Sequence, residues 1–265
     1  MPSEISQIMD TRANMFNLLS RVFRKEVDAE FLDELMHVRY PQHTGNELAD
    51  ISYRYIHRYL CNAREATLDE LAVDYARIFL GLGSLDAHAA YPFESVYTSE
   101  KGLLMQDARD KVLAFYRAND VVKDKSWKEP EDHLAAELEF MKIMSLRCRD
   151  LLDNGKEEEA RANVEVQRDF LVNHLMNWTE KFFDDVPLYA STDFYSAFSE
   201  LTRTYTADDL ALLNEMLEGA PDEECESADE DAETPDKATE EISGESAASA
   251  EECDEADVEE RDGNA

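Results

Sequence analysis

Basic residues are scarce in this sequence, where 26 lysines and arginines stand against 61 aspartates and glutamates. Residues 219–265 hold 20 of the acidic residues and two of the basic ones, which leaves 41 acidic and 24 basic residues in 1–218. A net charge near −17 on that body argues against nucleic acid or anionic lipid as the main partner, because both are negative. A basic peptide is the natural complement, although acidity can also serve solubility alone.

Long hydrophobic runs are absent as well. No stretch approaches the roughly 18 apolar residues of a membrane span, so we expect no stable membrane insertion. Residues 1–6 offer neither the basic nor the apolar segment of a secretory signal peptide. Together these absences predict a cytoplasmic protein.

Cysteine is sparse, with four residues and no CxxC pair or other metal-ligand spacing. Cys61 and Cys148 fall among apolar positions of helical spacing and are expected to be small buried hydrophobes, typical of a reducing compartment. We therefore expect no metal and no other cofactor.

Residues 219–265 contain no aromatic residue, and their large aliphatic residues are Ile242 and Val258. Such a segment buries too little apolar surface to offset its chain entropy. The sequence predicts a folded domain at residues 1–218 followed by a disordered acidic tail at 219–265.

Apolar residues recur with the helical period through most of 1–218, and no alternating β-branched run predicts a strand. We expect an all-α, single compact helical domain. Thr67 and Glu70 have the spacing of a capping box that would open a helix. Residues 84–97 lack a helical pattern and are expected to form a loop, with the next helix at about 99–118.

Acidic residues crowd the segment Glu129-Pro130-Glu131-Asp132-His133. Pro130 suits the first turn of a helix, where acidic neighbours favour the helix dipole. His133 and Glu137, at i and i+4, share a helix face and could bind a metal, and Asp132 with His133 could form an acid–base pair. A well-capped helix start with a solvated histidine explains the same residues.

Aromatic residues gather in the expected loop, in Tyr91-Pro92-Phe93-Glu94-Ser95-Val96-Tyr97. They either pack beneath the loop or line an apolar groove with a polar rim. A third segment, Tyr75-x-x-x-Phe79-x-Gly81, has the spacing of core residues on a helix that ends at glycine. Ser95 has no evident base partner, and neither GxSxG nor a phosphate loop is present, so we expect no enzyme.

Taken together, these segments resemble the TorD/DmsD family of redox-enzyme maturation chaperones. Residues 129–141 are similar to that family's E-x-P-x-D-H signature and its trailing helix, with the acid here adjacent to Pro130. Residues 92–97 are similar to its P-x-E-S-x-Y/W loop, and residues 75–81 to its Y-x-x-L-F-x-G segment, with Ile78 at the frequent leucine. The resemblance covers residues 8–217 and leaves out the tail.

The resemblance implies an all-helical chaperone that binds the twin-arginine leader peptide of a molybdenum-containing oxidoreductase, of the dimethyl sulfoxide or trimethylamine oxide reductase type. The chaperone would hold the enzyme in the cytoplasm, as a monomer or homodimer, until its cofactor is inserted. The carboxylates would set specificity while the aromatic residues supply most of the affinity. The expected peptide-binding residues are Tyr91, Pro92, Phe93, Glu94, Ser95, Tyr97, Glu129, Pro130, Asp132 and His133.

Two other functions remain open from the sequence. A helical adaptor would dock the folded enzyme or an assembly factor and would not bind an isolated leader. A metal-dependent hydrolase would use His133 and Glu137 together with nearby acidic residues.

Overall fold

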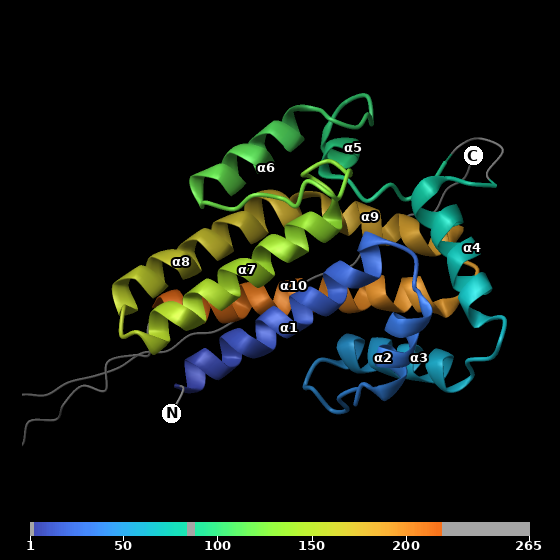
Figure 1. The fold of residues 1–265 in the computed structure, drawn as a ribbon, viewed down its shortest axis with the longest axis horizontal. Helices are drawn as coiled ribbons and strands as arrows, with labels where there is room; N and C mark the ends of the chain where they lie inside the picture. Colours follow the sequence, from blue (N-terminus) through green and yellow to red (C-terminus); the bar gives the residue numbers. More distant parts are fainter. Residues whose placement is uncertain (1–2, 84–87, 219–265) are drawn as a thin grey trace, which may run out of the picture. The chain divides into compact units, whose positions relative to one another are not determined.

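Helices make up nearly all of the regular structure in the computed structural model, which describes residues 3–83 and 88–218 (Figure 1). Within these residues the one β-type contact is an isolated antiparallel bridge between Phe93 and His133. The all-α prediction is therefore confirmed. The expected tail at 219–265, and residues 84–87 of the expected loop, lie outside the described residues.

Most of the helices follow one another with short connections, and the longer connections are residues 81–93 and 119–133. They are α1 (Glu4–Arg24), α2 (Ala29–His37), α3 (Glu47–Cys61), α4 (Thr67–Leu80), α5 (Glu94–Thr98), α6 (Asp107–Ala118), α7 (Leu134–Asp153), α8 (Glu157–Phe170), the π-helical turn η1 (Leu171–Leu175), α9 (Met176–Tyr189) and α10 (Asp193–Glu218).

Two helices far apart in the sequence, α1 and α7, pack along each other (Figure 1). Ser3 caps α1 by accepting the backbone N–H of Ser6 at 3.1 Å. The Ser20 hydroxyl of α1 donates to the backbone carbonyl of Ala135 at 2.7 Å, so small residues let the two backbones approach closely. Helix α8 packs on α7, and α10 packs on α3, α8 and α9.

Arg12 interrupts the apolar stripe of α1 and is nevertheless buried. Its Nε and Nη2 donate to the two carboxylate oxygens of Asp209 on α10, at 2.6 and 2.8 Å. Its Nη1 donates to Oε1 of Gln167 on α8 at 2.7 Å. This forked ion pair joins three helices and satisfies a charge that would otherwise be buried alone.

Two helix starts differ from the expected ones. The prediction of a capping box at Thr67 is wrong. Thr67 is the first residue of α4 rather than its N-cap, and its hydroxyl accepts the backbone N–H of Arg64 at 2.9 Å. Pro130 precedes α7 instead of lying in its first turn, and His133 is the N-cap. The reason is that the Leu134 N–H donates to the Pro92 carbonyl at 2.9 Å, so the preceding residues are held in a turn.

The segment between α4 and α6 also differs from expectation. It contains the short helix α5, where a helix-free loop was expected, and the helix expected at 99–118 begins only at Asp107. The Ser95 hydroxyl accepts the backbone N–H of Gln106 at 3.1 Å, which holds residues 99–106 as a loop folded back on α5. Cys148 is buried as expected, whereas Cys61, in the last turn of α3, is exposed.

The described helices include none that is long and apolar enough to cross a membrane.

The Arg12–Asp209 pair predicts a large stability effect. Arg12→Met should lower the free energy of unfolding by about 3–5 kcal/mol, because Asp209 is then left buried without its counter-charge. Urea unfolding followed by circular dichroism measures this loss. The matched control is Arg58→Met, which breaks the exposed pair with Asp193 and should cost less than about 1 kcal/mol. Equal losses in the two variants would contradict the assigned role of Arg12.

Candidate functional site

The two segments singled out in the sequence, residues 91–97 and 129–133, are hydrogen-bonded to each other. The Glu94 N–H donates to the Asp132 carbonyl at 2.9 Å, and the Leu134 N–H donates to the Pro92 carbonyl at 2.9 Å. Between these bonds Phe93 and His133 form the β bridge, and their rings meet edge to face at 4.9 Å. Because both segments are tied through the backbone, the start of α5 and the start of α7 form one rigid junction.

Asp132 fastens this junction with its side chain. Its Oδ2 accepts the backbone N–H of Ser95 at 3.0 Å and the Ser95 hydroxyl at 2.5 Å. Ser95 then accepts the Gln106 N–H, so the contact extends to the start of α6. Asp132 and Ser95 are both fully buried. The Asp132 carboxylate therefore orders three elements and is not presented to solvent.

His133 is also an interior residue. Its Nδ1 accepts the backbone N–H of Ala135 at 3.0 Å, and its ring packs against the ring of Trp127 at 5.1 Å. Burial, and secondarily the positive charges of Arg24 and Lys123, lower the pKa of His133 to about 3. The imidazole is therefore neutral near pH 7. Below pH 6.5, the ordinary pKa of histidine, the unfolded state binds a proton that the folded state does not, so His133 favours unfolding as the pH falls.

A cluster of acidic side chains lies beneath the junction. Glu94 is 3% exposed, and its Oε2 lies 3.2 Å from Nδ1 of His174 in the π turn η1. Glu137 is fully buried, and its Oε2 accepts Nε1–H of Trp178 at 3.1 Å. Burial raises the pKa of Glu137 well above its ordinary value, and the nearby charges of Glu94 and Asp132 raise it further. Glu137 is consequently held in its neutral, protonated form.

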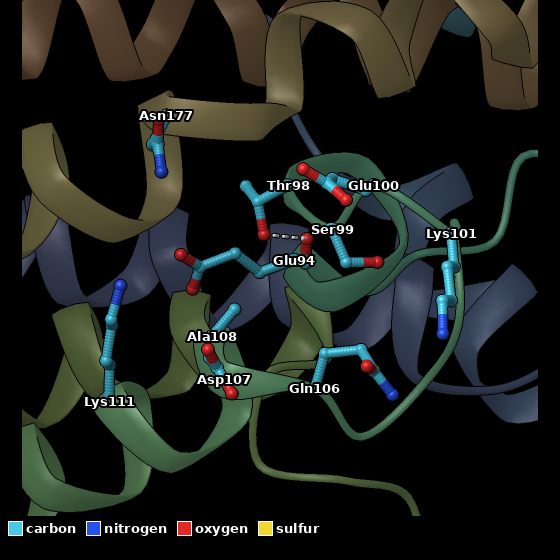
Figure 2. Close-up of a pocket in the computed structure, with 10 residues that line it drawn as sticks. All are labelled: Glu94, Thr98, Ser99, Glu100, Lys101, Gln106, Asp107, Ala108, Lys111 and Asn177. Carbon is cyan, nitrogen blue, oxygen red and sulfur yellow. Dashed lines mark hydrogen bonds between the residues drawn. The ribbon is translucent and has the colours of Figure 1, made fainter.

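Glu94 also lines a pocket of about 390 Å³ (Figure 2). The other lining residues come from the end of α5, the loop that follows it, α6 and α9, and they are Thr98, Ser99, Glu100, Lys101, Gln106, Asp107, Ala108, Lys111 and Asn177. Figure 2 shows the Glu94 side chain extending from its helix toward the side of the pocket where Lys111 and Asn177 lie. Of the charged lining residues, Glu94 is buried and the other four are exposed.

The two acidic neighbours of Pro130 lie apart from this pocket. Glu129 is exposed and borders a second, larger hollow of about 620 Å³, next to Arg24 and Tyr75. Glu131 is half-buried and pairs with Arg109 of α6, whose Nε donates to its Oε2 at 2.7 Å. Glu129 is therefore the acidic residue of the turn that remains open to a partner.

The loop aromatic residues are packed inward to different degrees. Phe93 is buried, and the half-buried ring of Tyr97 stacks on Trp178 at 5.5 Å while its hydroxyl donates to Asp185 at 3.0 Å. Tyr91 packs against Gly81, which ends α4 with φ +68°, and a Cβ at Gly81 would lie 2.6 Å from the Tyr91 hydroxyl. The third segment, 75–81, thus contacts the same loop.

The structure therefore brings the ten expected residues to one region, but it buries most of their side chains. Pro92, Phe93, Ser95, Asp132 and His133 are interior, whereas Glu94 and Glu129 border hollows. Sequence reasoning missed His174, Asn177 and Trp178, which reach the region from η1 and α9. No local motif marks them, because the π turn that aims His174 at Glu94 has no signature in the sequence.

The metal-dependent hydrolase considered from the sequence would need a set of metal ligands, and the residues suggested for it have other partners. His133 Nδ1 and one Glu137 oxygen already accept backbone or indole N–H groups. Across residues 3–83 and 88–218, no group of three or more histidine, cysteine, aspartate or glutamate residues is arranged to hold a metal ion.

The raised pKa of Glu137 predicts a pH-dependent stability. Above pH 4.5 the unfolded state releases this proton while the folded state keeps it, so Glu137 favours unfolding increasingly as the pH rises. Glu137→Gln should therefore gain stability relative to the wild type between pH 4.5 and 7.5, by up to about 1.4 kcal/mol per pH unit. Urea unfolding at several pH values tests this. The control Glu139→Gln, on the same helix, should show no such gain, and parallel curves for Glu137→Gln and the wild type would contradict the assignment.

Comparison with known proteins places this arrangement in a family. Residues 46–184 match the sequence profile described as nitrate reductase delta subunit. The chain is 27% identical to the chaperone protein TorD of Vibrio cholerae over 230 residues, which cover 82% of this chain and 99% of that protein.

Two further relatives match a shorter part of the chain at higher identity. The chaperone protein TorD of Vibrio parahaemolyticus is 33% identical over 144 residues, or 54% of this chain and 64% of that protein. The chaperone protein TorD of Photobacterium profundum is 30% identical over 150 residues, or 57% of this chain and 67% of that protein. The resemblance carried by residues 75–81, 92–97 and 129–141 is thus confirmed. The TorD/DmsD group consists of chaperones and not of enzymes. The chain belongs to this group, which the sequence profile describes as the nitrate reductase delta subunit family.

Proposed function

We propose that this protein is a cytoplasmic chaperone that binds the twin-arginine leader of a molybdenum-containing oxidoreductase and holds the enzyme until its cofactor is inserted. The observation that carries the proposal is the junction itself. It joins the two segments most similar to the family signature and sets the buried Glu94 carboxylate at the edge of a pocket. Family membership and the chaperone relatives support the same function.

Charge complementarity supports a basic client segment. The chain carries 61 acidic against 26 basic residues, and an acidic surface accelerates encounter with a cationic peptide. Glu94 and Glu129 supply carboxylates at the two hollows, and carboxylates accept guanidinium groups in a forked geometry.

Charge alone is too weak to hold a leader. Exposed ion pairs contribute about 0–1 kcal/mol each, whereas micromolar binding needs about 8 kcal/mol. Buried apolar area, at roughly 25 cal/mol per Å², must supply most of the difference. The loop aromatic residues are largely packed already, so exposed apolar residues are better suited to this task. Leu103, Leu104 and Met105, which follow α5, are 46–62% exposed.

The proposal predicts that an isolated leader peptide binds the full chain. Isothermal titration calorimetry with a synthetic twin-arginine leader should give a micromolar Kd, and replacing both arginines by lysines should weaken it about fivefold or more, because lysine cannot form the forked contact. Raising the salt concentration should weaken the arginine peptide further.

A scrambled peptide of equal composition serves as the control for unspecific charge attraction. Equal binding of the scrambled and native peptides would contradict specific recognition. No binding of the leader, together with binding of the complete enzyme, would favour the helical adaptor instead.

A further inference from the structure

The pocket beside α5 has an unusual distribution of charge. Its buried charged residue is Glu94, while Glu100, Lys101, Asp107 and Lys111 are exposed at its edge. A buried carboxylate interacts more strongly with an incoming charge than an exposed charged group does, because water and salt screen the exposed group. The inner part of the pocket therefore favours a cation even though two lysines lie at its edge.

The cluster behind Glu94 strengthens this preference. Glu94 and Asp132 both lie near enough to Glu137 for their charges to raise its pKa, and one oxygen each of Glu137 and Asp132 is buried without a hydrogen-bond partner in the described part of the chain. His174 contacts Glu94 through its Nδ1 at 3.2 Å, and its ring lies 5.5 Å from the ring of Phe115. A cation entering from the pocket would offset the negative charge that Glu94 and Asp132 bring to this buried region.

The remaining polar lining residues fit a planar group with several donors. Thr98, Ser99, Gln106 and Asn177 all carry side-chain oxygen atoms, in addition to the Glu94 carboxylate. A guanidinium presents five N–H donors in a fixed plane and no acceptor, so it can use a carboxylate and neighbouring neutral oxygens together. An ammonium ion has three donors and gains less from the same surroundings.

An apolar edge adjoins the pocket. The loop that contributes Ser99, Lys101 and Gln106 to the lining also carries Leu103, Leu104 and Met105, with exposed fractions of 52%, 46% and 62%. Met105 adopts a left-handed backbone with φ +58°, which non-glycine residues rarely do. The loop thus presents three neighbouring apolar side chains to solvent next to an acidic pocket.

We propose that this pocket is a subsite for one arginine side chain of the leader, with Glu94 as its anionic partner and residues 103–105 as the contact for the apolar residues that follow that arginine. This inference rests on the proposed function and specifies how the leader is seated. One arginine enters the pocket, and the other remains at the acidic surface.

Two substitutions should change leader affinity in opposite directions. Glu94→Gln keeps the size of the side chain and its contact with His174 but removes the charge, so the leader should bind about fivefold or more weakly. Lys111→Gln removes a competing positive charge from an exposed position and should strengthen binding about twofold or more. Asp110→Asn, an exposed neighbour outside the pocket lining, is the matched control and should leave the Kd unchanged.

A double-mutant cycle identifies the arginine. Leaders in which the first or the second arginine is replaced by glutamine are titrated against the wild type and Glu94→Gln by calorimetry. One replacement should weaken binding to the wild type but have little further effect on Glu94→Gln, whereas the other should weaken binding to both proteins.

The outcomes separate the two proposals. If the wild type binds the leader and neither Glu94→Gln nor Lys111→Gln alters the Kd, the arginine subsite is wrong and the proposed function stands. If Lys111→Gln weakens binding, the pocket takes an anionic group and the subsite is again wrong. If the wild type does not bind the leader at all, both proposals fall.

Discussion

The Asp132 carboxylate is the contact on which the candidate site depends. By accepting both the N–H and the hydroxyl of Ser95, it fixes the start of α5 against the start of α7. Ser95 passes this constraint to Gln106 and hence to α6. Because the carboxylate is fully buried, losing its partners would leave a desolvated charge, so the arrangement is held tightly. Residues 92–97 and 129–141 are similar to a family signature. The contact between Asp132 and Ser95 gives these segments a structural role, in addition to any contact with a client.

The site combines a rigid interior with an adaptable edge. Its interior holds the neutral His133, the protonated Glu137 and the aromatic pair Tyr97–Trp178. Its edge holds exposed lysines, acidic residues and the apolar loop at 103–105. This division would suit the proposed binding of a leader peptide, because a rigid part avoids an ordering cost while the edge adjusts to differing sequences.

The long helices were predictable from the sequence because their apolar residues recur at helical spacing and one face is buried, as at Phe16, Leu19 and Phe23 of α1. Convergence of the loop at 91–97 with the turn at 129–133 was predictable only through the family resemblance. Helix α5 was not, because its five residues are ordered by Asp132, which lies 37 positions after Ser95. Burial of Phe93 and His133 was equally hidden, since a loop aromatic residue has the same local sequence whether it faces a groove or the core.

The ion pair between Arg12 and Asp209 spans 197 positions of the chain, so it has a consequence for biosynthesis. While the ribosome is still adding residues before α10, the guanidinium of Arg12 has no counter-ion and must stay hydrated. The amino-terminal helix packs mainly along α7, but the burial of Arg12 cannot be completed until the last helix has emerged. Completion of this domain is a late event, and a nascent chain halted before residue 209 would leave Arg12 without its counter-charge.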